Sequence, residues 1–212
     1  MNNKKSDKEL ETQEALEKNI LGSLSIGSDV LKWYTKMGKD LFRRIGLQPR
    51  NVVLDFGCRV GNYTIPAAGV VGRKGTVYAL DKKHSAIDEL MRRASIMNLD
   101  DIITPMRTNG ELDINLEENS VDFILFYDII RSLLRIDGTL DPYRRLLDEF
   151  DRILKHGGKL SVFIKHLHSQ SISPHDVLGI TESVFDHHQS TELELMHWDN
   201  LETGTIHNFR KI

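Results

Sequence analysis

The sequence predicts an α/β fold built on a doubly wound, mostly parallel β-sheet. Two short apolar runs, at residues 52–54 and 76–80, are each followed by an aspartate and by turn-forming residues, a pattern typical of buried parallel strands. A helix-like stretch separates the two runs. In a doubly wound sheet, ligands bind outside the carboxyl ends of the strands, so the residues that follow each run are expected to face one crevice.

The turn after the first run, at residues 55–61 (DFGCRVG), favours an adenosine cofactor. Glycine lets the backbone approach a ligand closely, and Asp81 after the second run is placed to accept hydrogen bonds from a ribose diol. A dinucleotide-binding turn would carry glycine at positions 57, 59 and 62, and the last two are Arg59 and Asn62. A P-loop is also excluded, because no G-K-[ST] follows the turn.

The order D-x-G-x-x-x-G in this turn resembles motif I of the class I S-adenosylmethionine-dependent methyltransferases. The resemblance runs from about residue 47 to residue 212 and includes an acidic turn and strand at 117–128 and the stretch LKHGG at 154–158, where the family usually has LKPGG. It implies a Rossmann-like, doubly wound sheet of about seven strands, mostly parallel, with a C-terminal antiparallel hairpin and helices on both faces.

The resemblance also implies S-adenosyl-L-methionine as the cofactor and S-adenosyl-L-homocysteine as the product. Asp55 would lie near the methionine end, Asp81 would bind the ribose, and Asn109-Gly110 stands where the family usually carries Asp-Ala next to the adenine. The residues expected to bind the cofactor are Asp55, Phe56, Gly57, Arg59, Gly61, Asp81, Lys82, Asn109, Gly110 and Tyr127.

Arg59 departs from the family pattern, which usually has a glycine at this place. Its guanidinium could pair with the carboxylate of the methionine moiety, since planar arginine makes such charge-assisted contacts well. It could instead fill the pocket and hinder the cofactor, or lie in solvent without affecting the site. The long, flexible side chain favours accommodation of the cofactor.

The segment before the methyltransferase-like region, residues 1–46, predicts a tail followed by a helical cap, and residues 47–212 form the methyltransferase domain. Residues 1–8 are polar and charged, which indicates disorder. Residues 10–45 have a helical pattern that breaks near 22–28. Only Trp33, Tyr34 and Met37 are candidates for touching a ligand, and the sequence leaves open whether this helix is a lid or packs on the sheet edge.

Local signals predict where several later elements begin. Ser85 with Asp88 resembles a capping box, and Asp141-Pro142 and Ser173-Pro174 each read as an N-cap followed by proline at the first helical position. Residues 192–198 and 205–211 read as two strands of a hairpin, joined by a turn region around 200–204.

Composition limits the classes of partner. The 212 residues carry a net charge of −3, which gives no basic surface for a nucleic acid, so nucleic-acid binding is not expected. No apolar run approaches the length of a membrane span, and the N-terminal residues do not resemble a signal sequence. With one cysteine, Cys58, a reducing cytoplasmic location is expected. A homo-oligomer remains possible through the apolar N-terminal helix.

The reacting groups are less well defined, because the cofactor carries an activated methyl group and a general base is optional. Tyr127 and Asp128, at the end of the fourth predicted strand, and His166, after the fifth, are the candidate catalytic residues. Neighbouring histidines at 166 and 168, and at 187 and 188, lack a clear set of four ligands, so no metal is expected.

The leading hypothesis is therefore a methyltransferase that acts on a small molecule, with RNA or protein as a less favoured acceptor. The alternative is a catalytically silent methyltransferase-fold protein that binds or scaffolds a partner, a reading motivated by Arg59 and by the lack of an obvious base. A nicotinamide-dependent dehydrogenase is disfavoured by the missing glycines.

Overall fold

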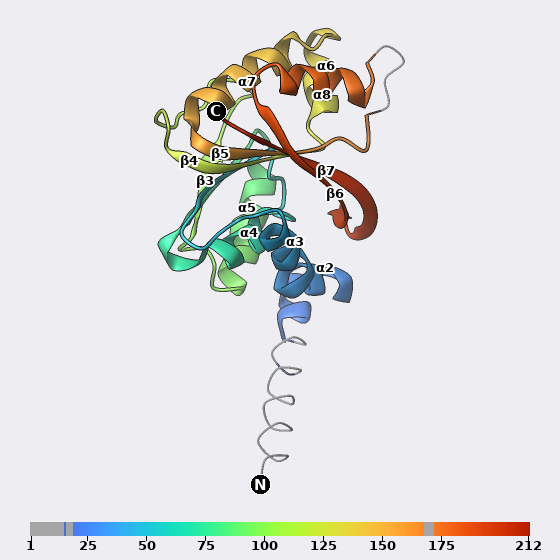
Figure 1. Ribbon diagram of the computed structural model, residues 1–212. Helices are drawn as coiled ribbons and strands as arrows, with labels where there is room; N and C mark the ends of the chain where they lie inside the picture. The colour runs from blue at the N-terminus through green and yellow to red at the C-terminus, as the bar shows by residue number, and fades with distance from the viewer. Residues whose placement is uncertain (1–14, 16–18, 168–171) are drawn as a thin grey trace.

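The computed structural model describes residue 15, residues 19–167 and residues 172–212. The expected disordered tail at residues 1–8 and the histidine at 168 lie outside these residues. Within the described part of the chain, seven strands form one sheet in the order β3-β2-β1-β4-β5-β7-β6 (Figure 1). The strands are β1 Val52–Phe56, β2 Thr76–Asp81, β3 Ile103–Arg107, β4 Val121–Tyr127, β5 Leu154–Phe163, β6 Asp186–His197 and β7 Asn200–Arg210.

The strand directions confirm a mostly parallel, doubly wound sheet. β1 pairs in parallel with β2 on one side and with β4 on the other, and the chain continues outward from these to β3 and β5. β7 is antiparallel to both β5 and β6, which confirms the antiparallel C-terminal hairpin. The winding reverses between β1 and β4, which is where ligands bind in such sheets.

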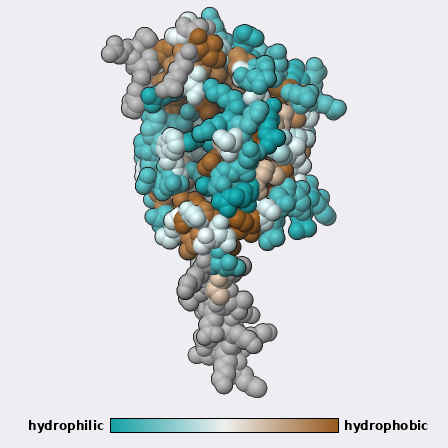
Figure 2. Space-filling view, turned by 180° about the vertical axis from the view of Figure 1, so that it is seen from behind, coloured by the Kyte–Doolittle hydropathy of each residue, from teal (hydrophilic) through white to brown (hydrophobic). Residues whose placement is uncertain are grey.

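Helices cover both faces of the sheet, as expected. Figure 1 shows α3, α4 and α5 below the sheet and α6, α7 and α8 above it, and each layer has its own apolar core. The surface seen from behind this view is mostly hydrophilic, and its apolar groups are separated by polar ones (Figure 2). The helices are α2 Ser28–Lys32, a π-helical turn Trp33–Met37, α3 Gly38–Arg44, α4 Thr64–Val71, a 3-10 turn Gly72–Lys74, α5 His84–Ile96, α6 Ile130–Asp137, α7 Asp141–Ile153 and α8 Pro174–Glu182.

The N-terminal helical segment packs into the lower core. The predicted break is present, because residues 25–27 separate a helical turn from α2. Trp33 and Tyr34 are completely buried, and both donate hydrogen bonds to Asn62 in the loop after β1. Met37 is half-buried and lines a surface groove with Leu193 of β6. No helix among residues 15, 19–167 and 172–212 is both long and apolar enough to cross a bilayer.

The predicted helix starts were correct in one case of three. At α8, Ser173 Oγ accepts from the backbone N–H of Asp176, and the carboxylate of Asp176 accepts from the backbone N–H of Ser173, which together form a capping box. The capping role of Ser85 was wrong, because α5 begins at His84 and its N-cap, Lys83, is held by the carboxylate of Asp81. The predicted Asp141 cap was wrong by one position, since Asp141 is the first helical residue of α7.

The hairpin differs from its prediction in length and in the position of its turn. β6 and β7 are longer than expected, and only Trp198 and Asp199 connect them. Trp198 adopts a positive φ of 56°, which is uncommon for a bulky residue. The predicted turn region at 200–204 was wrong, because these residues belong to β7 and pair across to β6. This shift places Glu202 on β7, where it lies beside His166.

Candidate active site

The turn after β1 is held against the end of β2. The backbone N–H groups of Gly57 and Cys58 both donate to the carbonyl of Leu80, at 2.8 and 3.0 Å. Gly57 has a positive φ of 82°, and a Cβ at this position would collide with the side chain of Ile129. Glycine is therefore required here by conformation and by space, because the side chain of Ile129 fills the place that a Cβ would take.

Asp81 organises the same turn from the end of β2. It is 8% exposed, its Oδ2 accepts from the backbone N–H of Arg59 at 2.8 Å, and its Oδ1 accepts from that of Lys83 at 2.7 Å. A carboxylate has about four acceptor positions, so each oxygen keeps capacity for a further donor. Asp81, which was predicted to bind the ribose, thus faces the crevice, and two backbone N–H groups fix the orientation of its carboxylate.

A first cavity, here called the β2 cavity, lies at the ends of β1, β2 and β3 and has a volume of about 510 Å3. The loop after β3 forms one wall and is tightened by Glu111, whose Oε2 accepts from Thr108 Oγ1 and from the backbone of Asn109. These hydrogen bonds, that from Thr108 foremost, lower the pKa of Glu111 to about 2. The expected cofactor residues that line this cavity are Phe56, Gly57, Arg59, Asp81, Lys82, Asn109 and Gly110.

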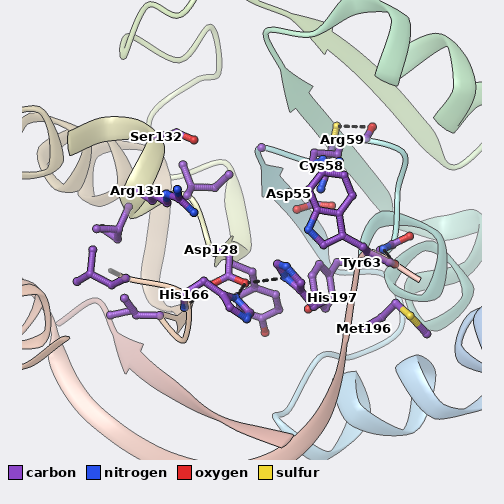
Figure 3. Close-up of a pocket in the computed structure, with 18 residues that line it drawn as sticks. Asp55, Cys58, Arg59, Tyr63, Asp128, Arg131, Ser132, His166, Met196 and His197 are labelled. Atoms are coloured by element: carbon purple, nitrogen blue, oxygen red, sulfur yellow. Dashed lines mark hydrogen bonds and ion pairs between the residues drawn. The ribbon is translucent and has the colours of Figure 1, made fainter. Parts of the chain in front are cut away.

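A second cavity, here called the β4 cavity, lies at the ends of β1, β4 and β5 beside the β6–β7 turn and has a volume of about 440 Å3 (Figure 3). It shares Gly57, Arg59, Ile129 and Ser132 with the β2 cavity, so the two cavities are neighbours. Its other polar and aromatic lining residues include Asp55, Asn62, Tyr63, Tyr127, Asp128, Arg131, His166, His197 and Trp198.

Asp55 is a buried carboxyl group in the β4 cavity. It is 3% exposed, and Thr64 Oγ1 donates to its Oδ2 at 2.5 Å. Burial raises the pKa of Asp55 to about 7, an effect that the hydrogen bond from Thr64 only partly opposes. Near neutral pH the site can therefore hold either a protonated or an ionised carboxyl group, and a cationic ligand would favour the ionised form.

Arg59 lies at the border of the two cavities. Its φ is 49°, and its guanidinium carbon lies 3.5 Å from the ring centroid of Trp198, over the indole face. Burial lowers the pKa of Arg59, although the nearby carboxylates of Asp81 and Asp199 act against this. The side chain is thus held on the hairpin turn by a cation–π contact. Whether it then pairs with a ligand carboxylate or hinders the ligand stays a prediction.

Gly61 lines neither cavity. It adopts a positive φ of 91°, and a Cβ here would collide with Leu90 of α5. Its expected contact with the cofactor stays untested, and its visible role is to let α5 pack closely against the loop. Trp33 and Tyr34 also line neither cavity. Both hydrogen-bond to Asn62, and Trp33 packs edge-on against Tyr63, and these two partners do line the β4 cavity.

Tyr127 lines the β4 cavity but is poorly suited to act as a base. Its hydroxyl shares a 2.8 Å hydrogen bond with Ser161 Oγ, and its ring packs edge-on against Tyr63 with centroids 4.7 Å apart. Burial raises the pKa of Tyr127 far above its ordinary value. A tyrosine in this state supports the floor of the cavity and does not accept a proton near neutral pH.

Asp128 and His166, two of the candidate catalytic residues, are in contact. His197 and Glu202, which were not predicted as site residues, lie beside them. His166 Nδ1 lies 2.7 Å from Asp128 Oδ2, and its Nε2 lies 3.2 Å from Glu202 of β7. His197, at the end of β6, places its Nδ1 3.2 Å from the same oxygen of Asp128 (Figure 3). His197 and Glu202 were missed because the predicted turn put Glu202 in a loop, and nothing in the sequence linked the hairpin to β4.

The comparisons with known proteins agree with this architecture. A family model described as "Methyltransferase domain" matches residues 54–162, just over half of the chain. The chain belongs to this family, and its sheet is that of the class I methyltransferases. A demethylmenaquinone methyltransferase of Bacillus cereus is 25% identical over 122 residues, which cover 58% of this chain and 48% of that protein. The chain thus spans about half the length of the curated relatives it matches.

Solved structures share the fold at low sequence identity. A SAM-dependent methyltransferase from Aquifex aeolicus matches with a TM-score of 0.64 and 19% identity, covering 91% of this chain and 97% of that chain. The [4+2]-cyclase SpnF matches with a TM-score of 0.61 and 15% identity, covering 82% and 80%. These likenesses show the fold alone, and the second belongs to a protein named for a different reaction.

Proposed function

We propose that this protein transfers a methyl group from S-adenosylmethionine to a small-molecule acceptor bound in the β4 cavity. The observation that carries the proposal is the meeting of two cavities at the point where the sheet reverses its winding. One cavity offers the oriented carboxylate of Asp81, and the other offers the buried carboxyl group of Asp55. Gly57 leaves the backbone bare at the border of the cavities, which suits a ligand that passes close to the backbone once the side chain of Ile129 moves aside.

The proposed cofactor residues follow from this geometry. Asp81 would accept from the ribose, the loop at Asn109 and Gly110 would lie beside the base, and Asp55 and Arg59 would face the charged methionine end. The cofactor, when bound, supplies an activated methyl group. The chain must therefore mainly position the acceptor and exclude water, since no covalent intermediate with the protein is needed.

A proton acceptor is available if the methyl acceptor needs one. Asp128 orients the ring of His166 through the 2.7 Å contact, which is the arrangement that fixes an imidazole for proton transfer. Both residues line the β4 cavity. Asp128 and His166 remain the proposed catalytic residues, and Tyr127 is the weakest of the three candidates because burial raises its pKa.

A small molecule is the favoured acceptor because of the size and form of the cavity. A volume of about 440 Å3 lies within the usual range of about 300–1,000 Å3 for small-molecule sites. The relatives named for demethylmenaquinone also point to small acceptors, although the chain covers only about half of their length. The buried, free thiol of Cys58 supports the proposed cytoplasmic location.

The second candidate function, a silent binding protein, is favoured by one observation. Ile129 lies directly against Gly57, and Arg59 lies at the same border, so both side chains flank the path between the two cavities. If they do not move, the cofactor cannot span the cavities. The protein would then keep the methyltransferase fold without methyl transfer.

Calorimetric titration with S-adenosylmethionine, S-adenosylhomocysteine and NAD tests the proposal and separates the two candidates. Binding of the first two at micromolar dissociation constants, without binding of NAD, is the expected result. At a ligand concentration 100 times the dissociation constant, the free energy of unfolding should rise by about 2.7 kcal/mol. Absence of binding to either sulfur compound would overturn the proposal and favour the silent protein.

A further inference from the structure

We propose that Asp128, His166, His197 and Glu202 form a binding site for one divalent transition-metal ion of the Zn²⁺ type at the β4 cavity. The four residues come from four places in the chain: the end of β4, the segment after β5, the end of β6 and the beginning of β7. Figure 3 shows three of them, Asp128, His166 and His197, pointing toward one another. The sequence predicted no metal because only histidines close together in the chain were considered as ligands. The four residues of this group are far apart in the chain and are brought together by the fold.

The distances fit a small ion. Each residue offers one ligand atom, and these atoms all lie within 4.8 Å of one another. His197 Nδ1 is 3.2 Å from Asp128 Oδ2, and His166 Nε2 is 3.2 Å from Glu202 Oε1. Around a tetrahedral ion with bonds of about 2.1 Å, ligand atoms are about 3.4 Å apart. Small side-chain movements are therefore sufficient to close the group around the ion.

Glu202 carries a buried oxygen atom without a hydrogen bond. This atom, Oε1, lies 3.2 Å from His166 Nε2 but makes no hydrogen bond, while Lys165 Nζ lies 3.3 Å from Oε2. A buried carboxylate oxygen without a donor destabilises a fold, and such an atom in a native protein requires an explanation. A bound cation at Oε1 would supply the missing partner, with Lys165 holding the other oxygen in place.

The two imidazole rings approach the same pair of carboxylates. His166 has a carboxylate oxygen near each ring nitrogen, Asp128 at 2.7 Å and Glu202 at 3.2 Å, and His197 Nδ1 also faces Asp128. The two rings lie 3.9 Å apart between centroids. The four side chains therefore converge within the range that one small ion can bridge.

The donor set selects the kind of metal. Two imidazole nitrogens and two carboxylate oxygens suit Zn²⁺ and its first-row neighbours, whereas Mg²⁺ and Ca²⁺ prefer ligands that are all oxygen. All four residues are half-buried, and three of them line the β4 cavity. An ion held there would face the cavity, and expansion from four to five ligands would admit one further ligand from it.

A fifth coordination position would define a class of acceptor, and this step rests on the proposed function. A molecule that offers an oxygen ligand, such as a hydroxyl or a carboxylate group, would complete the coordination of the ion and be fixed beside the cofactor crevice. The metal site itself does not depend on methyl transfer, and with the ion bound His166 would act as a ligand instead of as the proton acceptor considered above.

The test is a calorimetric titration of tag-free, chelator-treated protein with Zn²⁺, with elemental analysis of the bound metal. One ion per chain is expected for the wild type, and Mg²⁺ should not compete. Because even outer-shell partners of metals are worth about 10–100-fold in affinity, His197→Ala and Glu202→Gln should each weaken Zn²⁺ binding at least about tenfold. The matched controls His175→Ala and Glu194→Gln change exposed residues and should bind Zn²⁺ as the wild type does.

Two results would overturn the metal site: no Zn²⁺ binding by the wild type, or unchanged binding by both ligand variants. S-adenosylmethionine is titrated in parallel, so that binding of the cofactor without Zn²⁺ rejects the metal alone, and binding of Zn²⁺ without the cofactor rejects the methyltransferase alone. If circular dichroism shows that the variants do not fold, the wild type loaded with Co²⁺ decides. Visible absorption bands of histidine-bound Co²⁺ support the site, and their absence rejects it.

Discussion

Trp33 Nε1 donates a 2.6 Å hydrogen bond to the backbone carbonyl of Asn62 and so joins the N-terminal helical segment to the loop after β1. Tyr34 donates to the side-chain oxygen of Asn62 at 3.1 Å, and the amide nitrogen of Asn62 donates to the carbonyl of Trp198 at 2.5 Å. One asparagine thus connects three parts of the chain. The sequence did not decide whether the N-terminal helical segment is a lid or packs on the sheet. In the structure it packs against the loop after β1 and holds it in place.

Trp33→Phe should therefore destabilise the protein although Trp33 lines neither cavity. The substitution removes the donor to a partly buried carbonyl, which should lower the free energy of unfolding by about 1–3 kcal/mol. Urea unfolding measures the change. Trp198→Phe is the control, because Trp198 is 57% exposed and the change there should be within about 1 kcal/mol. Equal effects of the two substitutions would contradict the role assigned to the hydrogen bond.

Asp81→Asn should weaken S-adenosylmethionine binding about 10- to 100-fold, because a hydrogen bond to a charged group contributes about 1.5–3 kcal/mol. Asparagine keeps one oxygen that can accept from the backbone N–H groups of the turn. Asp81→Ala would remove both of these hydrogen bonds and could disturb the turn itself. Calorimetry gives the affinity, and Asp100→Asn, at an exposed position, is the control. Unchanged affinity in Asp81→Asn would reject the assignment of the ribose site.

Asp55 should make the stability of the ligand-free protein fall as the pH rises. Its pKa is raised to about 7 in the folded state, whereas the unfolded chain titrates near 3.8. Between these values the folded state holds a proton that the unfolded state has released, so the free energy of unfolding decreases with pH by up to about 1.4 kcal/mol per unit. The contribution is complete below the unfolded pKa and is lost as the pH passes through about 7.

Urea unfolding between about pH 4.5 and 7.5 measures this slope. Asp55→Asn should reduce the slope, because an amide does not titrate, while Asp148→Asn at an exposed position should leave it unchanged. The same ionisation should couple to ligand binding, so that the cationic cofactor binds more tightly as the pH rises through about 7. A slope that persists in Asp55→Asn would show that another group is responsible.

Arg59→Gly should weaken S-adenosylmethionine binding with little change in stability. Arg59 is the one cationic side chain of the described residues that lines both cavities, so it is best placed to meet the methionine carboxylate. Loss of the contact with Trp198 costs about 0.5–1 kcal/mol. Glycine relieves a left-handed backbone by about 1 kcal/mol, which offsets this loss. Calorimetry would reveal tighter binding instead if the side chain obstructs the site, and Arg59→Lys controls for charge.

The half of the site at the ends of β1 and β2 was predictable because its signals are local in the chain. A parallel strand followed by a glycine turn places Asp55, Gly57 and Asp81 at one edge of the sheet whatever the rest of the fold does. The positions of these residues required only the recognition of the strands.

The half of the site on the hairpin was not predictable for two physical reasons. The asparagine and glycine at 200 and 204 suggested a turn, but pairing with β6 outweighs their low strand propensity. The real turn uses Trp198 with a positive φ, which its contact with Arg59 stabilises across the fold and which no sequence rule anticipates. Without the correct turn, His197 and Glu202 cannot be assigned to one end of the sheet.

The strand order β5-β7-β6 has a consequence for synthesis of the chain. β6 joins the sheet only through β7, which is made later, so β6 has no place in the sheet until the last strand has left the ribosome. The β2 cavity is lined by residues made much earlier, between 56 and 136. We expect the nascent protein to complete the β2 cavity first and the β4 cavity, which includes Met196, His197 and Trp198, last.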